Sequence, residues 1–350
     1  MGRARFCLLA AAAVLFCFVE ELSPAYPQEN PVAIAAVHGL DAPRKFENGF
    51  QIFWRSTSVA GDPQPGETDP EAKIRIFEGP QRELVVCRLA SSIRSFDPAF
   101  SGVSIYDVSA RRPGFIAVAA VYLRMTGSPV ALLLYFDWSG SLSRRVVLRN
   151  RPGIQSLEVV SADQVWALND FGPMDQSRFV FTAFDRNGAV IKEVVRSHRD
   201  WSTDESMSKG GQTSFGVIGD RVWTWLPKSR TFISFNSLDG RAETKSTQFP
   251  RVGQSSALYA RQAALLPNGQ LLMDVGWMRF GKWSSGWFAW SSQSGWREVN
   301  SSFRNRYLYA VEGNRVIFTA PREPTGASST FRSVSIDDLM ANISPPNFPR

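Results

Sequence analysis

The stretch Phe184-Asp185-Arg186-Asn187-Gly188 recurs along the chain in altered form, and this recurrence is the strongest indication of the fold. In each copy an aromatic residue is followed by a small polar residue and, a few positions later, by glycine. The copies begin at Phe136, Phe184, Phe235 and Trp290, which lie 48, 51 and 55 residues apart. A regular spacing of this size indicates repeated units, each too small to bury both of its faces alone.

A second turn signature lies out of phase with the first. It consists of a Gly, Asn or Asp turn, a polar residue and an apolar run, as in Gly219-Asp220-Arg221-Val222-Trp223. The equivalent positions, two weaker N-terminal copies included, are Phe50, Phe115, Gln164, Arg221, Gln270 and Arg315. Their steps of 65, 49, 57, 49 and 45 residues predict six repeats.

Each complete repeat divides into four short segments that are rich in Val, Ile, Phe and Trp and bounded by turn residues, which favours strands. In the third repeat we expect strands at 157–160, 165–168, 179–184 and 190–195. Four strands are the content of one β-propeller blade. The sequence therefore predicts an all-β, six-bladed β-propeller of four-stranded antiparallel blades, with 336–342 as the best candidate for a short helix.

The two ends of the chain predict how the ring closes. The last repeat offers only three strands before the tail that contains Pro345-Pro346. The apolar segment 32–37 precedes the first repeat, so we expect this N-terminal strand to complete the last blade and leave no interior sheet edge unpaired. We expect a single propeller domain over residues 31–340, followed by a C-terminal tail at 341–350.

The first residues have the pattern of a targeting segment. Arg3 and Arg5 precede an apolar run at 6–19, and Ser23-Pro24-Ala25 supplies small residues for cleavage. The apolar run is shorter than the roughly 20 residues that a spanning helix needs. We therefore expect a signal peptide at 1–25, no transmembrane segment after its removal, and a secreted or periplasmic protein. A retained membrane anchor is the alternative.

Cysteine and histidine are scarce, which excludes several kinds of site. Cys87 is the single cysteine outside the expected signal peptide, and the whole chain has 2 histidines. An intrachain disulfide is excluded in the mature chain, and a Cys or His zinc site is disfavoured. The acidic stretch 66–71 lacks the ligand spacing of a calcium loop, and nucleotide-binding motifs are absent from the sequence. We expect no metal, no cofactor, no nucleic-acid partner and a monomer.

Loop lengths predict which face of the ring binds a ligand. Connections between strands one and two, and between three and four, are tight; the others are long, as at 55–72, 90–102 and 276–285. Binding residues usually lie on variable loops carried by a rigid scaffold, so we expect the site on the long-loop face. The candidates there are interblade arginines and loop aromatics: Arg149, Arg151, Arg251, Arg304, Arg306, Trp277, Phe280 and Trp283.

These two groups of side chains suit different ligands. The arginines suit an anionic ligand or an acidic surface, and the rings suit a sugar, a peptide or a partner protein. Solvated surface arginines and rings packed between blades are the structural alternatives. The weak candidate for a catalytic group is His198, as a general base; the alternative is a solvated loop histidine.

In its strand and turn periods, over about residues 31–340, the chain resembles the six-bladed propellers grouped with the TolB-like and NHL-repeat proteins. The segment 268–274 has the Gly, apolar pair and Asp of the NHL pattern but lacks the Asn-x-Arg that follows there. The resemblance implies the fold, whereas such propellers include hydrolases, lyases, dehydrogenases and interaction modules. We expect a noncatalytic binding module for a protein, a glycan or an anionic small molecule. The alternative is a small-molecule hydrolase or lyase that acts in the axial channel, with His198 as its base.

Overall fold

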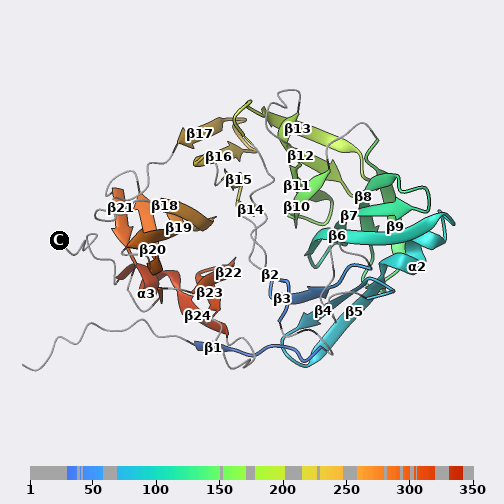
Figure 1. Ribbon diagram of the computed structural model, residues 1–350, viewed down its shortest axis with the longest axis horizontal. Coiled ribbons are helices and arrows are strands. Elements are labelled where there is room, and N and C mark those ends of the chain that lie inside the picture. Colours follow the sequence, from blue (N-terminus) through green and yellow to red (C-terminus); the bar gives the residue numbers. More distant parts are fainter. Residues whose placement is uncertain are drawn as a thin grey trace, which may run out of the picture.

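The computed structural model is a closed ring of six four-stranded antiparallel sheets, so the prediction of a six-bladed all-β propeller is confirmed (Figure 1). The expected signal peptide, His38 and most of the expected C-terminal tail lie outside the described residues. The structure describes residues 30–37, 40, 42–57, 69–149, 153–170, 178–201, 215–226, 229–246, 258–279, 282–291, 295–299, 303–304, 306–319 and 331–341.

Five blades are built from four strands that follow one another along the chain, and the sixth takes its outermost strand from the N-terminus. The first three blades contain β2 (Lys45–Glu47), β3 (Phe50–Trp54), β4 (Lys73–Glu78) and β5 (Arg82–Arg88); β6 (Phe100–Ala110), β7 (Ile116–Arg124), β8 (Pro129–Phe136) and β9 (Leu142–Val147); β10 (Ile154–Val159), β11 (Gln164–Asn169), β12 (Phe179–Asp185) and β13 (Val190–Arg196). The last three contain β14 (Phe215–Ile218), β15 (Arg221–Leu226), β16 (Thr231–Asn236) and β17 (Ala242–Ser246); β18 (Leu258–Leu265), β19 (Leu271–Arg279), β20 (Lys282–Ser291) and β21 (Gly295–Glu298); β22 (Tyr307–Glu312), β23 (Arg315–Thr319), β24 (Phe331–Ser335) and β1 (Asn30–Val32).

The N-terminal strand closes the ring as predicted, although its bounds differ from the expected 32–37. β1 lies beside β24, with Asn30 opposite Ser333. The rest of the apolar segment leaves that sheet and packs on the first blade, where Val37 joins a buried cluster with Phe53. Gln51 holds it there, because its side chain accepts the N–H of Ala35 at 2.8 Å.

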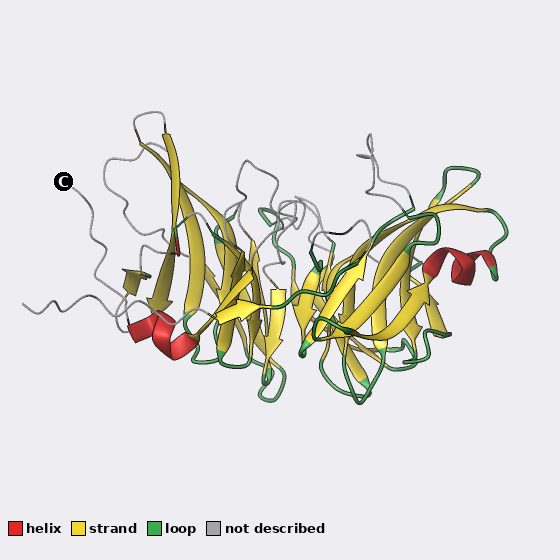
Figure 2. Cartoon of the chain, turned by 90° about the horizontal axis from the view of Figure 1, so that it is seen from below, coloured by secondary structure: helices red, strands yellow, loops and turns green. Residues whose placement is uncertain are grey.

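The hairpin between β12 and β13 explains the first turn signature. In the edge-on view of Figure 2, short loops between strands lie along the lower edge of the ring. Asp185 Oδ1 accepts the N–H groups of Asn187 and Ala189, each at 2.8 Å, which fixes the turn. Gly188 has a φ of 78°, and a β-carbon there would collide with Val146 of the preceding blade. Glycine is needed at this turn both for the left-handed backbone and for the close approach of two blades.

Apolar side chains fill the space between neighbouring blades. One cluster joins the first and second blades, and others join the second to the third and the third to the fourth. The ring of Trp287 packs edge-on against Phe318 of the last blade, with 5.4 Å between centroids. Each fully buried side chain of this size stabilises the fold by roughly 1.5–3 kcal/mol, so the ring is held by its interblade surfaces.

Among the described residues, short helices follow β5 and β24. α3 (Ile336–Ala341) lies within the expected segment 336–342. α2 (Leu89–Arg94) is a departure, because residues 90–102 were expected to be a loop. Leu89, Ala90 and Ile93 are buried on one side of α2, and this apolar stripe holds the turn in helical form. Within the described residues no helix combines the length and apolar character needed to cross a membrane.

Candidate functional site

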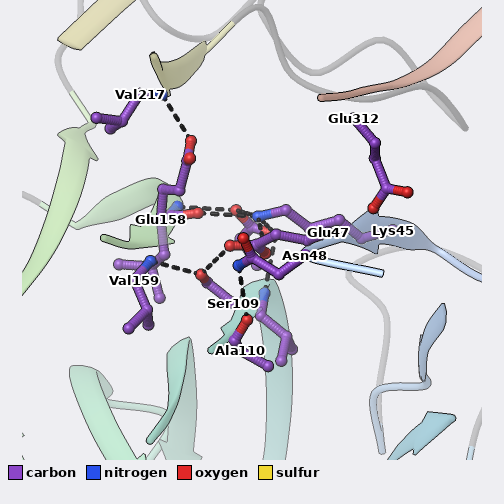
Figure 3. Close-up of polar contacts among 12 residues, drawn as sticks. Lys45, Glu47, Asn48, Ser109, Ala110, Glu158, Val159, Val217 and Glu312 are labelled. Carbon is purple, nitrogen blue, oxygen red and sulfur yellow. Dashed lines mark hydrogen bonds and ion pairs between the residues drawn. The ribbon is translucent and has the colours of Figure 1, made fainter. Parts of the chain in front are cut away.

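The innermost strands of the first three blades carry charged and polar side chains that meet at one level of the ring (Figure 3). Lys45 and Glu47 lie on β2, Asp107 and Ser109 on β6, and Glu158 on β10. We call these five residues the axial clasp. They lie near the end of each strand, just before its tight turn, whereas the sequence predicted binding residues on the opposite, long-loop face.

Lys45 is the hub of the axial clasp. Its Nζ lies 3.1 Å from Asp107 Oδ2 on the second blade and donates to the carbonyl of Leu157 on the third blade at 2.8 Å. Glu47 Oε2 lies 3.2 Å away, close enough for an ion pair but outside hydrogen-bond geometry. The Lys45 and Asp107 side chains are 13% and 7% exposed, so this ammonium group links three blades in a largely water-free place.

Glu47 and Ser109 form the second link of the clasp. The Ser109 hydroxyl donates to Glu47 Oε1 at 2.5 Å and accepts the N–H of Val159 at 2.7 Å. One hydroxyl therefore joins a carboxyl group on the first blade to the backbone of the third. The Glu47 side chain is 9% exposed. An ionised Glu47 would therefore hold its charge away from water, which is unfavourable unless that charge is neutralised.

Carboxyl groups on one blade accept backbone N–H groups of the next. Asp107 Oδ2 accepts from Leu157 at 2.8 Å, and Glu158 Oε2 accepts from Val217 on β14 at 2.7 Å. Glu158 keeps partial exposure, unlike Glu47. The clasp thus extends from the first blade to the fourth, and its polar groups satisfy strand ends that would otherwise be buried without partners.

The turn that follows β2 extends these links in both directions around the ring. Asn48 and Gly49 both have positive φ, as a two-residue hairpin turn requires. The Asn48 side chain donates to the carbonyl of Ala110 at 2.9 Å, and the N–H of Gly49 donates to Glu312 on β22 at 3.1 Å. A turn that the sequence marked as a weak copy of the repeat therefore joins the sixth, first and second blades.

Burial and mutual repulsion shift the acidity of the clasp. Burial raises the pKa of Glu47 to about 7, opposed by Lys45 and by the Ser109 hydroxyl. Burial, with repulsion from Glu47, raises the pKa of Glu158 to about 8, although Lys45 opposes it. Burial by itself lowers the pKa of Lys45, but attraction from Asp107 and the two glutamates outweighs it, so that pKa lies above its ordinary value.

The chemistry open to the clasp is proton binding and the joining of blades. Two carboxyl groups whose pKa values burial raises lie beside the Lys45 ammonium group. Among the described residues no group of three or more His, Cys, Asp or Glu side chains could hold a metal ion. The clasp itself offers no activated nucleophile, because its only hydroxyl, on Ser109, donates to a carboxyl group and has no histidine partner.

Three of the predicted arginines lie in described interblade connections. Arg149 is exposed. Arg304 pairs with Glu298, with Nε and Oε1 3.0 Å apart, and the Arg306 guanidinium lies over the Phe303 ring at 5.2 Å. The remaining two lie outside the described residues: Arg151 and Arg251.

The predicted aromatic loop at 276–285 is wrong as a loop, because most of it belongs to the paired strands β19 and β20. Trp277 is partly buried and packs edge-on against Phe288, with 6.4 Å between centroids. Trp283 is opposite Met278 in the ladder. Phe280 lies outside the described residues.

His198 follows β13, the outermost strand of the third blade. Its side chain is 56% exposed, with Nδ1 3.3 Å from Asp200 Oδ2, and its ring lies beside Trp201. The axial clasp belongs to innermost strands, so His198 is on a different part of the blade from the buried carboxyl groups.

Exposed apolar side chains on the long-loop face are the feature that the sequence did not indicate. Leu123 and Met125, next to the turn between β7 and β8, are 39% and 76% exposed, and Tyr307 at the start of β22 is 44% exposed. Single apolar residues beside a turn look like ordinary strand ends, so only the structure reveals their exposure. The axial clasp was also missed, although Glu47 and Glu312 both end an innermost strand just before a Gly or Asn turn.

No family model matches this chain, and no curated protein matches its sequence. The chain is similar to several solved structures, each with a TM-score below 0.5. A Bacteroides fragilis protein thought to be exported is 9% identical, with 90% of this chain and 96% of that chain covered and a TM-score of 0.48. A luciferin-regenerating enzyme is 9% identical, with 93% and 96% covered and a TM-score of 0.42. YCF48 bound to a D1 peptide is 9% identical, with 90% and 100% covered and a TM-score of 0.39. At such identities the likeness concerns strand arrangement alone.

Proposed function

We propose that this chain is an exported propeller that acts as a noncatalytic binding module and contacts its partner through the long-loop face. The observation that carries the proposal is the exposure of Leu123, Met125 and Tyr307 at that end of the blades, with Arg149 exposed there too. Apolar side chains held in water, on a face that also carries an exposed arginine, favour recognition of a protein, a glycan or an anionic small molecule.

A rigid support favours this use of Met125. Its backbone N–H donates to the carbonyl of Ala99 at 2.7 Å, which ties the β7–β8 turn to the chain before β6. The neighbouring Arg124 donates from Nε to Asp97 at 2.7 Å, and the Tyr122 hydroxyl donates to the same carboxylate at 2.6 Å. A turn whose backbone is fixed in this way loses little conformational entropy on binding.

The alternative of a hydrolase or lyase receives less support. His198 is exposed and lies beyond an outermost strand, whereas that mechanism requires a base in the axial channel. The polar groups of the axial clasp are already bound to other blades. We therefore place the noncatalytic module first.

The experiment compares two equally exposed apolar residues on opposite faces. Met125 is 76% exposed on the long-loop face, and Leu238, in the tight turn between β16 and β17, is 78% exposed. Purified wild type, Met125→Asp and Leu238→Asp are tested by quantitative capture from an envelope extract and by binding to glycan and polyanion arrays. We expect Met125→Asp to weaken the captured interaction by about thirtyfold or more, as for a hot-spot residue, and Leu238→Asp to leave it unchanged. Loss with Leu238→Asp alone, or with neither variant, contradicts the proposal.

The predicted aromatic and basic residues belong to the same proposal. Alanine variants of Trp277, Trp283 and Arg149 test whether the binding surface on the long-loop face includes these residues. If a variant captures the same partners as the wild type, its residue does not belong to the binding surface. Export is tested separately by cell fractionation and by mass spectrometry of the mature N-terminus, which we expect near Ala25. Light scattering of the purified protein tests the expected monomer.

A further inference from the structure

The axial clasp collects more negative than positive charge in a buried place. β2 contributes Lys45 and Glu47, β6 contributes Asp107 and β10 contributes Glu158, whereas β14 presents the backbone N–H of Val217. With all three carboxyl groups ionised, the clasp would carry a net charge of −2. Isolated buried charge of this size is strongly unfavourable, and protonation is the usual way in which proteins avoid it.

Protons on Glu47 and Glu158 remove that excess. Lys45 and Asp107 then form the single ion pair of the clasp, at 3.1 Å. Protonated Glu47 can still accept from the Ser109 hydroxyl, and protonated Glu158 can still accept from Val217, so no interblade hydrogen bond of these two side chains is lost. Glu312 is the next acidic group around the ring, and it is bound to Gly49 on the other side of the β2 turn.

We propose that the axial clasp is a proton-operated lock on the ring. With Glu47 and Glu158 protonated, it holds together the innermost strands of the first four blades; loss of both protons drives the first and third blades apart by repulsion between the two carboxylates. The lock is independent of the long-loop face and of any partner bound there.

The pH range follows from the shifted groups. Both glutamates have a folded pKa above the ordinary value of 4.5, at about 7 and about 8. A carboxyl group whose pKa is raised by folding stabilises the folded state fully below its unfolded pKa, and this stabilisation is lost as the pH rises toward the folded value. The lock is therefore closed in acid and opens around neutral to mildly alkaline pH.

The test measures proton linkage in the full-length mature protein by urea unfolding at a series of pH values from about 5.5 to about 8.5. In the wild type we expect the unfolding constant to increase by about tenfold to about a hundredfold per pH unit up to about pH 7, the values for one and two linked protons. In the Glu47→Gln/Glu158→Gln variant, which keeps neutral acceptors at both places, we expect most of that increase to disappear; Glu312, whose pKa burial also raises, remains as a linked group. Glu78→Gln removes a surface carboxylate that is 50% exposed and should retain the wild-type dependence.

A second measurement does not depend on variants that fold. Infrared titration of the wild type over the same pH range should show protonated carboxyl absorption that is lost between about pH 6 and about pH 9. Over this range hydrogen exchange at Val159 and Val217, corrected for intrinsic rates, should accelerate more than exchange on the outer strand β13. Absence of the infrared band above about pH 6, or identical pH dependence in the wild type and the double variant, overturns the proposal.

Discussion

Replacing Lys45 by methionine tests the balance of forces at the centre of the ring most directly. Methionine retains much of the aliphatic stem but removes the ammonium group that pairs with Asp107 and donates to Leu157. Asp107 would keep its two backbone donors, the N–H groups of Val108 and Leu157, each at 2.8 Å. Its compensating cation would be gone while its side chain remains only 7% exposed.

The magnitude follows from burial. Removing one partner of a buried ion pair costs about 3–5 kcal/mol, because the other charge stays buried without compensation. The matched control is Arg82→Met, which breaks the pair between Arg82 and Glu78, whose side chains are 68% and 50% exposed. Exposed pairs contribute about 0–1 kcal/mol. The two variants remove the same type of interaction and differ mainly in exposure to water.

The assay is urea unfolding at pH about 7 followed by tryptophan fluorescence, with linear extrapolation to zero denaturant. We expect Lys45→Met to lose at least about 2 kcal/mol more than Arg82→Met, a large part of the about 5–15 kcal/mol available to a typical domain. The deficit should shrink in acid, because protonation of Glu47, whose pKa burial raises, removes one of the carboxylates that the Lys45 ammonium group compensates. Equal losses of unfolding free energy in Lys45→Met and Arg82→Met, or a deficit of Lys45→Met that grows in acid, would contradict the explanation by buried charge.

Three further changes test other parts of the ring. Gly188→Ala should lower the free energy of unfolding by about 2–4 kcal/mol, measured by thermal or urea unfolding, because the new methyl group collides with the preceding blade. The control Gly269→Ala, at a φ of 81° with open space around it, should lower it by about 1 kcal/mol. Similar losses in the two variants would contradict the close approach of the blades at Gly188. Gln262→Leu removes both hydrogen bonds to the backbone of Leu308 in the next blade, at 3.0 and 2.8 Å. We expect the free energy of unfolding to fall by about 2–4 kcal/mol, because the Leu308 N–H and carbonyl groups stay buried without these partners. An unchanged free energy of unfolding would show that those groups find other partners. Tyr122→Phe removes the hydroxyl that donates to Asp97, which is the main cause of the lowered pKa of Asp97. NMR titration of that carboxyl group should show its pKa rising toward the ordinary value, and an unchanged pKa would assign the shift to Arg124 instead.

The repeat architecture was readable because its determinants are local. An aspartate that caps its own turn and a glycine with left-handed backbone two or three residues later act within five positions, as Asp185 and Gly188 do. Four-strand blades follow from such turns, since each one fixes where a strand ends. The number of blades and the direction of each strand could therefore be predicted without any knowledge of tertiary contacts.

Predictions failed where a distant partner decides local structure. The apolar segment 32–37 looked like one strand, but only its first residue pairs with β24, and the rest packs against the first blade. The segment 276–285 was expected to be a loop, but most of it lies in β19 and β20. In the structure Gly286 lies in β20 beneath Trp277, where a β-carbon would approach the ring to 3.2 Å. Glycine in a strand can mark close packing of a neighbour rather than a turn, and sequence alone does not separate the two.

The axial clasp shows why the same limit applies to charged residues. Lys45 meets Asp107 across 62 positions and Leu157 across 112, so strand periodicity gives no hint of either contact. Among the described residues the seam between the fourth and fifth blades is instead an apolar cluster in which Trp225 and Leu265 take part. Apolar surfaces of this kind tolerate many pairings, whereas each clasp group requires one particular partner at one level. We therefore attribute most of the stability to the interblade cores, and the alignment of the first four blades to the clasp. The alignment requires buried carboxyl groups in excess of the one ammonium group of Lys45, and protons on Glu47 and Glu158 neutralise that excess.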